Sequence, residues 1–487
     1  MSRADPRAWL SALALQLLLG LLGIMGMPAR AAEAAAVPHR VTHGQFVDAE
    51  VFAPTGTAQQ FVLLFAGGET AGAGDRQLAQ SMAAKGAMVV VVPLAAFYRR
   101  IAADSATCVY AAGAVENFAR YVQAFEKLPS YIAPLLVGTG DGGGSFVYAL
   151  LAQAPVDSFT GALSLGFCPR LSLGMPLCAS NALRMQAAGS GAMDLAPVAR
   201  LPAPWTVLQA DGQGACAGAA RSFVERVPQA TWGPMPASST APAASAGNPG
   251  TAAMGPEQQA AFDKAYDRLA ARRAALETAP QQLADLPIVE VPASAGNSGT
   301  RFAVFLSGDG GWASIDKRVA AALAKDGVPV VGIDSLRYFW SARTPEGVAA
   351  DLDRVIRYYA ARWKRSEVLL VGYSQGADVL PFAFNRLPDA SRARVRLTTL
   401  LGPGQQAAFE FHVTNWIGRS GDRPIAPEAR RMPGTGTLCF YGADERADSL
   451  CPLLDGTGAQ IVSMPGGHHL GGDYEALAAR ILAALPR

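Results

Sequence analysis

The sequence has little net charge, few charged side chains and few histidines, and each scarcity excludes a class of function. The formal net charge of the 487 residues is only +2, which gives no electrostatic reason to expect nucleic-acid binding. Half of the residues are apolar and 16% are charged, which is typical of a globular chain and not of a disordered one. A histidine-rich metal cage is disfavoured because the chain has five histidines: His39, His43, His412, His468 and His469.

The N-terminus has the layout of a secretory signal peptide. Arg3 and Arg7 precede an apolar run over Trp9–Met27, and Pro28–Ala31 offers a cleavage site of small residues. We therefore expect export, with residues 1–31 removed and the rest of the chain outside the cytoplasm. The apolar run is almost long enough to span a bilayer, so retention as a membrane anchor is the alternative.

Cysteine is sparse, and its pattern predicts disulfides. Six cysteines in an exported chain favour pairing, since compartments outside the cytoplasm are oxidising. None lies in a Cys-x-x-Cys motif, which argues against zinc and thioredoxin-type chemistry. Proximity in the sequence favours the pairs Cys168–Cys178 and Cys439–Cys451, and leaves Cys108–Cys216 as the third.

A shift in composition near the middle divides the chain into two halves. Residues 233–256 are almost entirely Pro, Ala, Ser, Gly and Thr, which is typical of a flexible linker. Good helix formers follow, with an apolar stripe, so residues 257–286 are expected to form a helix that packs on a domain and a connector. The remaining chain then forms two domains, over residues 38–232 and 287–487.

Both halves alternate apolar strands with amphipathic helices. This alternation predicts a mostly parallel sheet covered on both faces, because each parallel strand needs a crossover helix to return the chain. In the second half the expected helices are 317–325, 345–362 and 474–485. The expected strands are 302–306, 328–333, 367–371, 397–401, 437–441 and 459–464.

The two halves resemble each other at matched positions. FVLLFAGGETAGAG, which starts at Phe61, parallels FAVFLSGDGGWASI, which starts at Phe302. Gly67 and Gly308 are 241 residues apart (308 − 67), and Gly140 and Ser374 are 234 apart (374 − 140). Similar offsets at two distant anchors predict two copies of one α/β domain.

Gly-Tyr-Ser-Gln-Gly at 372–376 stands between an apolar strand and a helix. This is the G-x-S-x-G pattern of the nucleophile elbow of α/β hydrolases, in which flanking glycines permit a tight turn that exposes the serine. A serine hydroxyl is a poor nucleophile by itself and needs a base and an acid that orients the base. We therefore expect two tandem α/β-hydrolase-like domains, with Ser374 as the nucleophile of the second.

The base and the acid should follow the serine in the chain. His468 and His469 follow the last expected strand, and we favour His468 as the base, with the other imidazole lining the pocket. Three carboxyls follow the strand over 437–441. We favour Asp444 as the acid, and Glu445 and Asp448 remain open.

An oxyanion hole needs backbone N–H donors beside the serine. The residue after the nucleophile, Gln375, is expected to supply one. The glycine-rich loop at 307–312 is expected to supply the other, from Asp309 or Gly310, because glycines let its backbone approach a substrate. No metal or organic cofactor is required by this chemistry.

The first copy lacks the serine and the histidine predicted for the active site of the second. Gly140 stands where Ser374 is expected by the offset, and no histidine occurs between His43 and His412. The first copy is therefore predicted to keep the fold without the catalytic groups, and to serve packing, substrate capture or partner binding.

SGDGGW, VGYSQGADVLPF, YGADE and PGGHHLGGDY together resemble the bacterial virulence protein family VirJ, from about Ile288 to Arg487. The long form, with an exported α/β half before that region, resembles the AcvB-like members. The resemblance implies a periplasmic α/β hydrolase that cleaves the aminoacyl ester of lysyl-phosphatidylglycerol at the outer surface of the inner membrane. It also implies a link to virulence and to type IV secretion components.

Several residues are compatible with such a substrate. Tyr338 and Trp340 follow a strand on the same edge as the serine and are candidates to meet the lipid. Asp309, Asp316 and Asp378 are candidates to hold a lysyl ammonium. A general carboxylesterase, or a non-catalytic periplasmic binding or chaperone protein that supports secretion, are the alternative functions.

Overall fold

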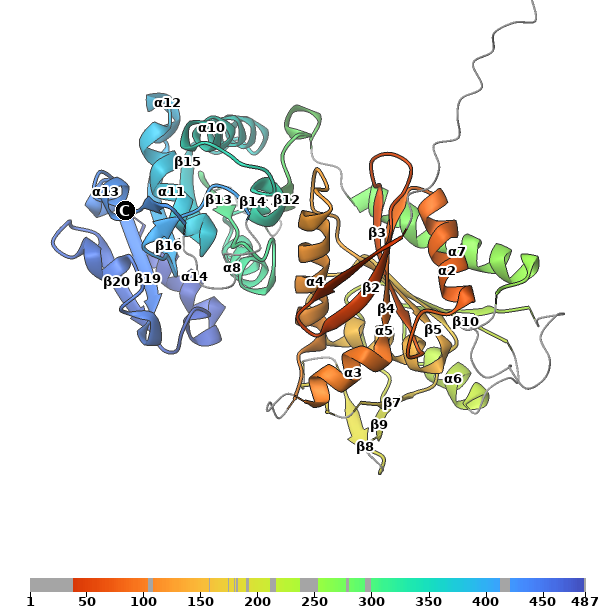
Figure 1. Ribbon diagram of the computed structural model, residues 1–487. Coiled ribbons are helices and arrows are strands. Elements are labelled where there is room, and N and C mark those ends of the chain that lie inside the picture. Colours follow the sequence, from red (N-terminus) through yellow and green to blue (C-terminus); the bar gives the residue numbers. More distant parts are fainter. Residues whose placement is uncertain are drawn as a thin grey trace, which may run out of the picture. The chain divides into compact units, whose positions relative to one another are not determined.

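The structure is a computed structural model (Figure 1). It describes residues 38–103, 108–156, 158–173, 175–178, 180, 183–189, 192–210, 216–236, 253–276, 280–293, 299–411 and 421–485. The predicted signal peptide lies outside the described residues, as does most of the predicted linker. Within those ranges, no helix combines the length and the apolar character needed to cross a membrane.

The N-terminal half, residues 38–276, contains an eight-stranded sheet in the order β1-β2-β4-β3-β5-β6-β10-β11. The first three strands of that order pair antiparallel and the rest pair parallel. The strands are β1 (His39–His43), β2 (Phe46–Phe52), β3 (Gln60–Ala66), β4 (Ala87–Pro93), β5 (Leu135–Thr139), β6 (Gly161–Leu165), β10 (Trp205–Gln209) and β11 (Ala230–Pro234). A small antiparallel sheet holds β7 (Arg170–Ser172), β9 (Ala192–Leu195) and β8 (Met185–Ala187).

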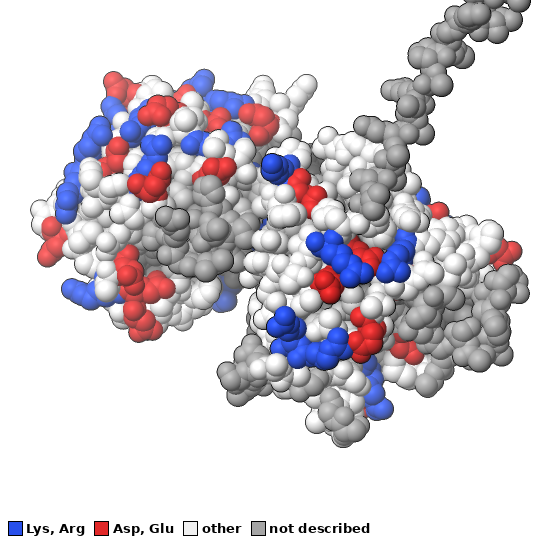
Figure 2. Space-filling view, in the orientation of Figure 1, with Lys and Arg blue, Asp and Glu red and all other residues white. Residues whose placement is uncertain are grey.

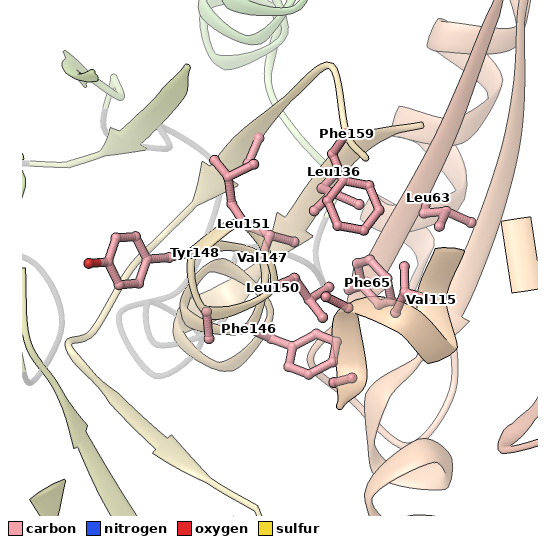
Figure 3. Packing of buried hydrophobic residues seen from close by; sticks show 14 of the residues in the cluster. Leu63, Phe65, Val115, Leu136, Phe146, Val147, Tyr148, Leu150, Leu151 and Phe159 are labelled. Atoms are coloured by element: carbon pink, nitrogen blue, oxygen red, sulfur yellow. The ribbon is translucent and has the colours of Figure 1, made fainter. Parts of the chain in front are cut away.

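Helices cover both faces of this sheet because its strands are apolar on both sides, as in β4, whose seven residues are all buried. On one face, Phe65 and Leu63 pack against Phe146 and Val115 of the covering helices (Figure 3). The helices are α2 (Ala73–Ala84), α3 (Leu94–Ala102), α4 (Ala111–Phe125), α5 (Gly140–Gln153), α6 (Ala217–Val224) and α7 (Pro256–Leu276).

The helix predicted after the linker is α7, and it packs on the first sheet. Phe262, Tyr266 and Leu269 are buried in the same apolar cluster as Val62 and Leu64 of β3. The apolar stripe read from the sequence therefore faces the N-terminal half. The predicted linker began too early, because its first two residues form the end of β11.

The C-terminal half, residues 280–485, contains a seven-stranded sheet in the order β12-β14-β13-β15-β16-β19-β20, in which only β12 runs antiparallel to its neighbour. The strands are β12 (Ile288–Val291), β13 (Arg301–Leu306), β14 (Val330–Ile333), β15 (Glu367–Tyr373), β16 (Val395–Leu401), β19 (Thr437–Gly442) and β20 (Gln460–Met464), with a short pair β17 (Gln406–Ala407) and β18 (Arg423–Pro424). The helices are α8 (Ser314–Lys325), α9 (Ser335–Tyr338), α10 (Pro345–Arg362), α11 (Gln375–Arg386), α12 (Asp389–Arg392), α13 (Ala426–Ala429) and α14 (Tyr474–Ala483).

The two sheets share one strand order. If β1 is set aside, each sheet runs first, third, second, fourth, fifth, sixth and seventh strand in chain order, and its first strand is antiparallel to its neighbour. This is the order of the α/β-hydrolase sheet. Phe65 pairs with Gly138 in the first sheet and Leu306 with Gly372 in the second, at the same offsets as the sequence anchors. The predicted fold class, with an α/β-hydrolase fold in each half, is confirmed.

The disulfides correct two of the three predicted pairs. Cys439–Cys451 forms as expected, whereas the others are Cys108–Cys178 and Cys168–Cys216. Cys168 and Cys216 come together because they follow β6 and β10, which are neighbours in the sheet. Cys108 meets Cys178 because the chain beside each forms a parallel bridge, Val109 with Leu177. Pairing therefore follows the sheet, and sequence proximity was a poor guide.

Charged side chains are interspersed over the face shown in Figure 2, where Lys and Arg alternate with Asp and Glu on both halves. Ion pairs in the two halves include Arg76 with Glu50 and Arg386 with Glu428. This mixed surface agrees with the small net charge of the chain.

Two helical glycines of the N-terminal half offer a matched test of the packing. A Cβ at Gly144 in α5 would lie 1.8 Å from the Gly166 carbonyl oxygen, whereas a Cβ at Gly218 in α6 meets nothing within 4 Å. We expect Gly144→Ala to lower the free energy of unfolding by about 2–3 kcal/mol or more. Gly218→Ala should be neutral or stabilise by up to about 1 kcal/mol. Thermal and urea denaturation measure both, and equal effects would contradict this packing.

Candidate active site

The turn after β15 places Ser374 at the carboxyl edge of the second sheet. Its backbone has φ 50° and ψ −120°, a conformation that costs free energy for a residue with a side chain. Flanking glycines are required, because a Cβ at Gly376 would lie 2.2 Å from the Leu306 carbonyl oxygen, and one at Gly372 would lie 2.5 Å from that of Gly376. The sequence Gly-Tyr-Ser-Gln-Gly therefore forms a nucleophile elbow.

The loop after β20 brings an imidazole to this serine. His468 Nε2 lies 2.9 Å from Ser374 Oγ, although the two residues are 94 positions apart. The Tyr373 ring packs 5.3 Å from the imidazole, and Gly402 is close enough that an added Cβ would touch the ring at 3.4 Å. These contacts fix the ring on two sides, so its orientation toward the serine is part of the local packing.

The other imidazole of the pair points elsewhere. His469 is exposed and precedes the short helix η7 (Leu470–Gly472). It has no hydrogen bond with Ser374, so the structure separates the two neighbours that the sequence left together. His468 holds the position expected of a base, and His469 does not.

The carboxyl beside His468 belongs to Glu445, which corrects the preference for Asp444. Glu445 Oε2 lies 3.1 Å from His468 Nδ1, whereas Asp444 and Asp448 are exposed and away from the ring. Both Asp444 and Glu445 lie in the short helix η5 (Ala443–Glu445), which directs consecutive side chains differently. The Asp444 amide donates to the Gly466 carbonyl at 3.1 Å, which ties this turn to the histidine loop. This hydrogen bond helps to decide which carboxyl faces the imidazole. No pattern in the sequence indicated that it would form.

The glycine-rich loop after β13 lies against the serine. A Cβ at Gly308 would lie 3.3 Å from Ser374 Cβ, and the Gly376 amide donates to the Ser307 carbonyl at 3.1 Å. The Gly311 amide donates to the Gly308 carbonyl at 3.0 Å, which closes a tight turn over 308–311. We call this segment the oxyanion turn, since it carries the predicted donors Asp309 and Gly310.

The third predicted donor starts the helix after the serine. Gln375 is the first residue of α11, and its side-chain amide donates to the Ala408 carbonyl at 3.2 Å. The backbone amide of Gln375 thus adjoins Ser374 in the chain, and Gly308 of the oxyanion turn lies close to the same serine. The structure therefore places Gln375 and Gly308 beside the serine. The assignment of the Asp309 or Gly310 amide as the second donor stays a prediction.

Another carboxyl near the elbow belongs to Asp378. Asp378, one helical turn after Ser374, accepts a hydrogen bond from the Gly404 amide at 2.8 Å. Burial raises the pKa of Asp378 to about 8, the Gly404 hydrogen bond opposes that rise, and the charge of Asp309 adds to it. The effect of Asp309 shows that these two carboxyls are electrostatic neighbours beside the nucleophile.

Asp316 is a helix cap and is not placed to hold a ligand. It is 1% exposed, and it accepts a hydrogen bond from the Ala313 amide at the start of α8. Asp75 does the same for Gly72 at the start of α2, which is the matching helix of the first half. This pairing explains Asp316 as part of the duplicated fold, so its prediction as an ammonium ligand is not supported.

The two aromatic residues predicted to meet substrate are packed into the protein. Tyr338 is 1% exposed, and its hydroxyl donates to Asp351 at 2.7 Å. The indole N–H of Trp340 donates to the Leu128 carbonyl at 2.7 Å, and its ring stacks on Phe411. Tyr338 belongs to the core, and Trp340 is held by the N-terminal half, so neither is presented to a substrate as the sequence suggested.

The matching turn of the first half keeps the shape and lacks the chemistry. Gly140 has φ 68°, the same positive sign as Ser374, but it has no side chain. The neighbouring Thr139 hydroxyl donates to Asp75 at 2.6 Å and is therefore engaged in holding α2. The first half thus retains a nucleophile elbow with no nucleophile.

The C-terminal half of the chain matches a known family. Residues 300–487 match the family described as bacterial virulence protein (VirJ), which confirms the resemblance noted in the sequence for this part of the chain. No curated protein matches the chain.

Solved structures similar to this chain include several esterases and related hydrolases. Est1E from Butyrivibrio proteoclasticus with bound ferulic acid is 14% identical, with a TM-score of 0.32 over 40% of this chain and 92% of its own. The esterase domain of a Rhodothermus marinus protein is 15% identical, with a TM-score of 0.30 over 41% and 91%. LpqC, a poly(3-hydroxybutyrate) depolymerase from Bordetella parapertussis, is 16% identical, with a TM-score of 0.28 over 42% and 88%.

Because these scores are low, the fold assignment rests on the strand order and the serine turn. The C-terminal half of this chain combines a match to the VirJ family with the sheet and the nucleophile elbow of an α/β hydrolase.

Proposed function

We propose that this chain is a serine hydrolase that cleaves a carboxylic ester. The observation that carries the proposal is the 2.9 Å distance between Ser374 Oγ and His468 Nε2, at an elbow whose backbone exposes the serine. A serine with an imidazole in hydrogen-bond contact, and a carboxyl on the far side of the ring, is the arrangement that activates a hydroxyl for acyl transfer.

The reaction proceeds through an acyl-enzyme. His468 Nε2 takes the proton of Ser374 as Oγ attacks the ester carbonyl carbon, and Glu445 stabilises the imidazolium through Nδ1–H. The Gln375 amide and the oxyanion turn donate to the negatively charged oxygen of the tetrahedral intermediate. His468 then protonates the leaving alcohol. Water, deprotonated by the same imidazole, attacks the acyl-enzyme and releases the acid.

The substrate we propose is the aminoacyl ester of lysyl-phosphatidylglycerol, whose hydrolysis gives lysine and phosphatidylglycerol. The VirJ match of the C-terminal half supports this assignment. Asp378, one helical turn after the nucleophile, supports it chemically, because in its ionised form this carboxyl can attract a cationic acyl group.

The location follows from the compartment that such a substrate requires. Three disulfides agree with an oxidising environment outside the cytoplasm. We place the enzyme in the periplasm, where it meets the outer leaflet of the inner membrane. A non-catalytic binding protein is the competing function, and the serine-free elbow at Gly140 favours that role for the first half alone.

Replacing the nucleophile tests the proposal directly. We expect Ser374→Ala to lower turnover of lysyl-phosphatidylglycerol in mixed vesicles by at least about 10³-fold, since only the binding contribution to catalysis remains. Release of lysine is measured by mass spectrometry, and circular dichroism checks the fold. Alanyl-phosphatidylglycerol and p-nitrophenyl acetate, run in parallel, distinguish an aminoacyl-lipid hydrolase from a general esterase. Native-like turnover by the folded variant would reject the serine mechanism.

The acid is tested by a matched pair of neighbours. Glu445→Gln removes the charge that stabilises the imidazolium, so kcat should fall by about 10²-fold or more. Asp444→Asn alters the adjacent exposed carboxyl and should leave kcat within about twofold of native. The rate of Ser374 labelling by a fluorophosphonate probe should follow the same order. A larger loss in Asp444→Asn than in Glu445→Gln would show that the acid is misassigned.

The pKa of Asp378 predicts a pH dependence of substrate binding. With a pKa of about 8, this carboxyl is mostly protonated at pH 7 and mostly ionised at pH 9, while a lysyl ε-ammonium stays charged. KM for lysyl-phosphatidylglycerol should therefore fall severalfold, by up to about tenfold, as pH rises from 7 to 9.

Two controls isolate that effect. Alanyl-phosphatidylglycerol has the same α-amino group without the ε-ammonium, so its KM should lack this component. Asp378→Asn should remove the difference between the two substrates. If the two KM profiles run parallel in the native enzyme, Asp378 does not recognise the ammonium.

A further inference from the structure

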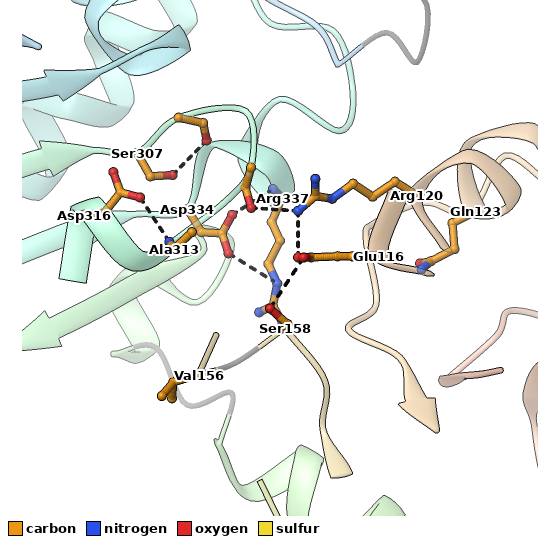
Figure 4. A network of polar contacts seen from close by, with 12 residues as sticks. Glu116, Arg120, Gln123, Val156, Ser158, Ser307, Ala313, Asp316, Asp334 and Arg337 are labelled. Atoms are coloured by element: carbon orange, nitrogen blue, oxygen red, sulfur yellow. Dashed lines mark hydrogen bonds and ion pairs between the residues drawn. The ribbon is translucent and has the colours of Figure 1, made fainter. Parts of the chain in front are cut away.

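A buried arginine of the N-terminal half reaches the oxyanion turn of the C-terminal half. Arg120 lies in α4, its side chain is 7% exposed, and Nη2 donates to the Gly310 carbonyl at 2.9 Å. The same nitrogen donates to Glu116 at 2.8 Å, one turn earlier in α4. Figure 4 shows this side chain extending from α4 to the loop beside Ser307.

The contact fixes the peptide unit that closes the turn. The Gly310 carbonyl and the Gly311 amide belong to one planar peptide. Arg120 holds the carbonyl end, and the Gly308 carbonyl accepts from the amide end at 3.0 Å. Because Gly310 and Gly311 have no side chains and Gly311 has φ 79°, the backbone of the turn is intrinsically free to adopt other conformations. The hydrogen bond from the Arg120 guanidinium is one restraint on it.

The surroundings of Arg120 exclude water from that hydrogen bond. Tyr131 is 6% exposed and lies under the guanidinium, 6.0 Å from ring centroid to Cζ. Tyr131 also belongs to a small apolar cluster with Ala133, Leu336 and Trp340, which joins the two halves. Burial acts to lower the pKa of Arg120, but the nearby charges of acidic groups raise it on balance, so the side chain stays cationic. A dry, charged hydrogen bond is stronger and more directional than one in water.

We propose that Arg120 is a positioning residue for the oxyanion turn, through which the serine-free N-terminal half sets the reactivity of Ser374. This inference rests on the proposed hydrolase function. The first half would then contribute to catalysis without touching substrate, because its guanidinium holds the Gly310–Gly311 peptide, which directly follows the peptides that carry the predicted Asp309 and Gly310 donors. Donors of an oxyanion hole must be held in place before the reaction to be effective.

A second contact between the halves provides the control. The Lys317 ammonium donates to the Val156 carbonyl at 2.6 Å, which also joins the halves. If Arg120 only held the halves together, removing either side chain would have the same kind of effect. If Arg120 positions the turn, only its removal should change the chemical step.

The experiment compares Arg120→Ala, Arg120→Lys and Glu116→Gln with Lys317→Ala in the full chain. For Arg120→Ala we expect kcat on lysyl-phosphatidylglycerol to fall by about 10- to 100-fold with KM nearly unchanged. The rate of fluorophosphonate labelling of Ser374 should fall in parallel, since that reaction also uses the oxyanion hole. Millimolar methylguanidinium should restore part of the lost rate by filling the vacated site. Lys317→Ala should match the native enzyme.

Each result bears on the inference separately from the proposed function. Loss of all turnover in Ser374→Ala together with native kcat and labelling in Arg120→Ala would keep the hydrolase and reject the positioning role. Equal losses of kcat in Lys317→Ala and Arg120→Ala would mean that Arg120 only holds the two halves together. If Arg120→Ala does not fold, Arg120→Lys and Glu116→Gln decide, because native kcat in both folded variants would also overturn the inference.

Discussion

The contact between Ser374 and His468 depends on a constraint of packing that precedes any chemistry. Gly372 and Gly376 lie so close to neighbouring backbone that any side chain would force the elbow apart. This close approach sets the strained backbone of Ser374, which directs the hydroxyl away from the sheet. The histidine loop then needs only to cross the same edge to meet it. Without the two glycines neither the elbow nor the 2.9 Å contact would form.

The two halves share the fold and the tight elbow, but only the second carries reactive side chains there. Both keep the strand order, the positive φ at the elbow and an aspartate that caps an earlier helix, Asp75 at the start of α2 and Asp316 at the start of α8. In the first half, Gly140 leaves nothing to activate. The fold is therefore stable without the site, and the first half is available for another task, such as holding the oxyanion turn through Arg120.

Electrostatics near the elbow separates roles among carboxyls that look alike in the sequence. Glu445 lies beside the imidazole, where a negative charge stabilises His468 as it gains a proton. Asp378 lies in a drier place, and burial raises its pKa to about 8. Asp316 caps the N-terminus of helix α8. The environment of each carboxyl, and not its residue type, decides whether it can orient a base, bind a cation or cap a helix.

The sequence alone determined the α/β-hydrolase fold in each half, the serine, and the loop that carries its imidazole, because strand periodicity, glycine spacing and chain order are local signals. The tertiary structure decided the rest: Glu445 over Asp444, His468 over His469, two disulfide pairs, and the burial of Tyr338. Each of these depends on which way a side chain points, or on which strands are neighbours in a sheet. Those relations form between segments far apart in the chain, so no local pattern records them.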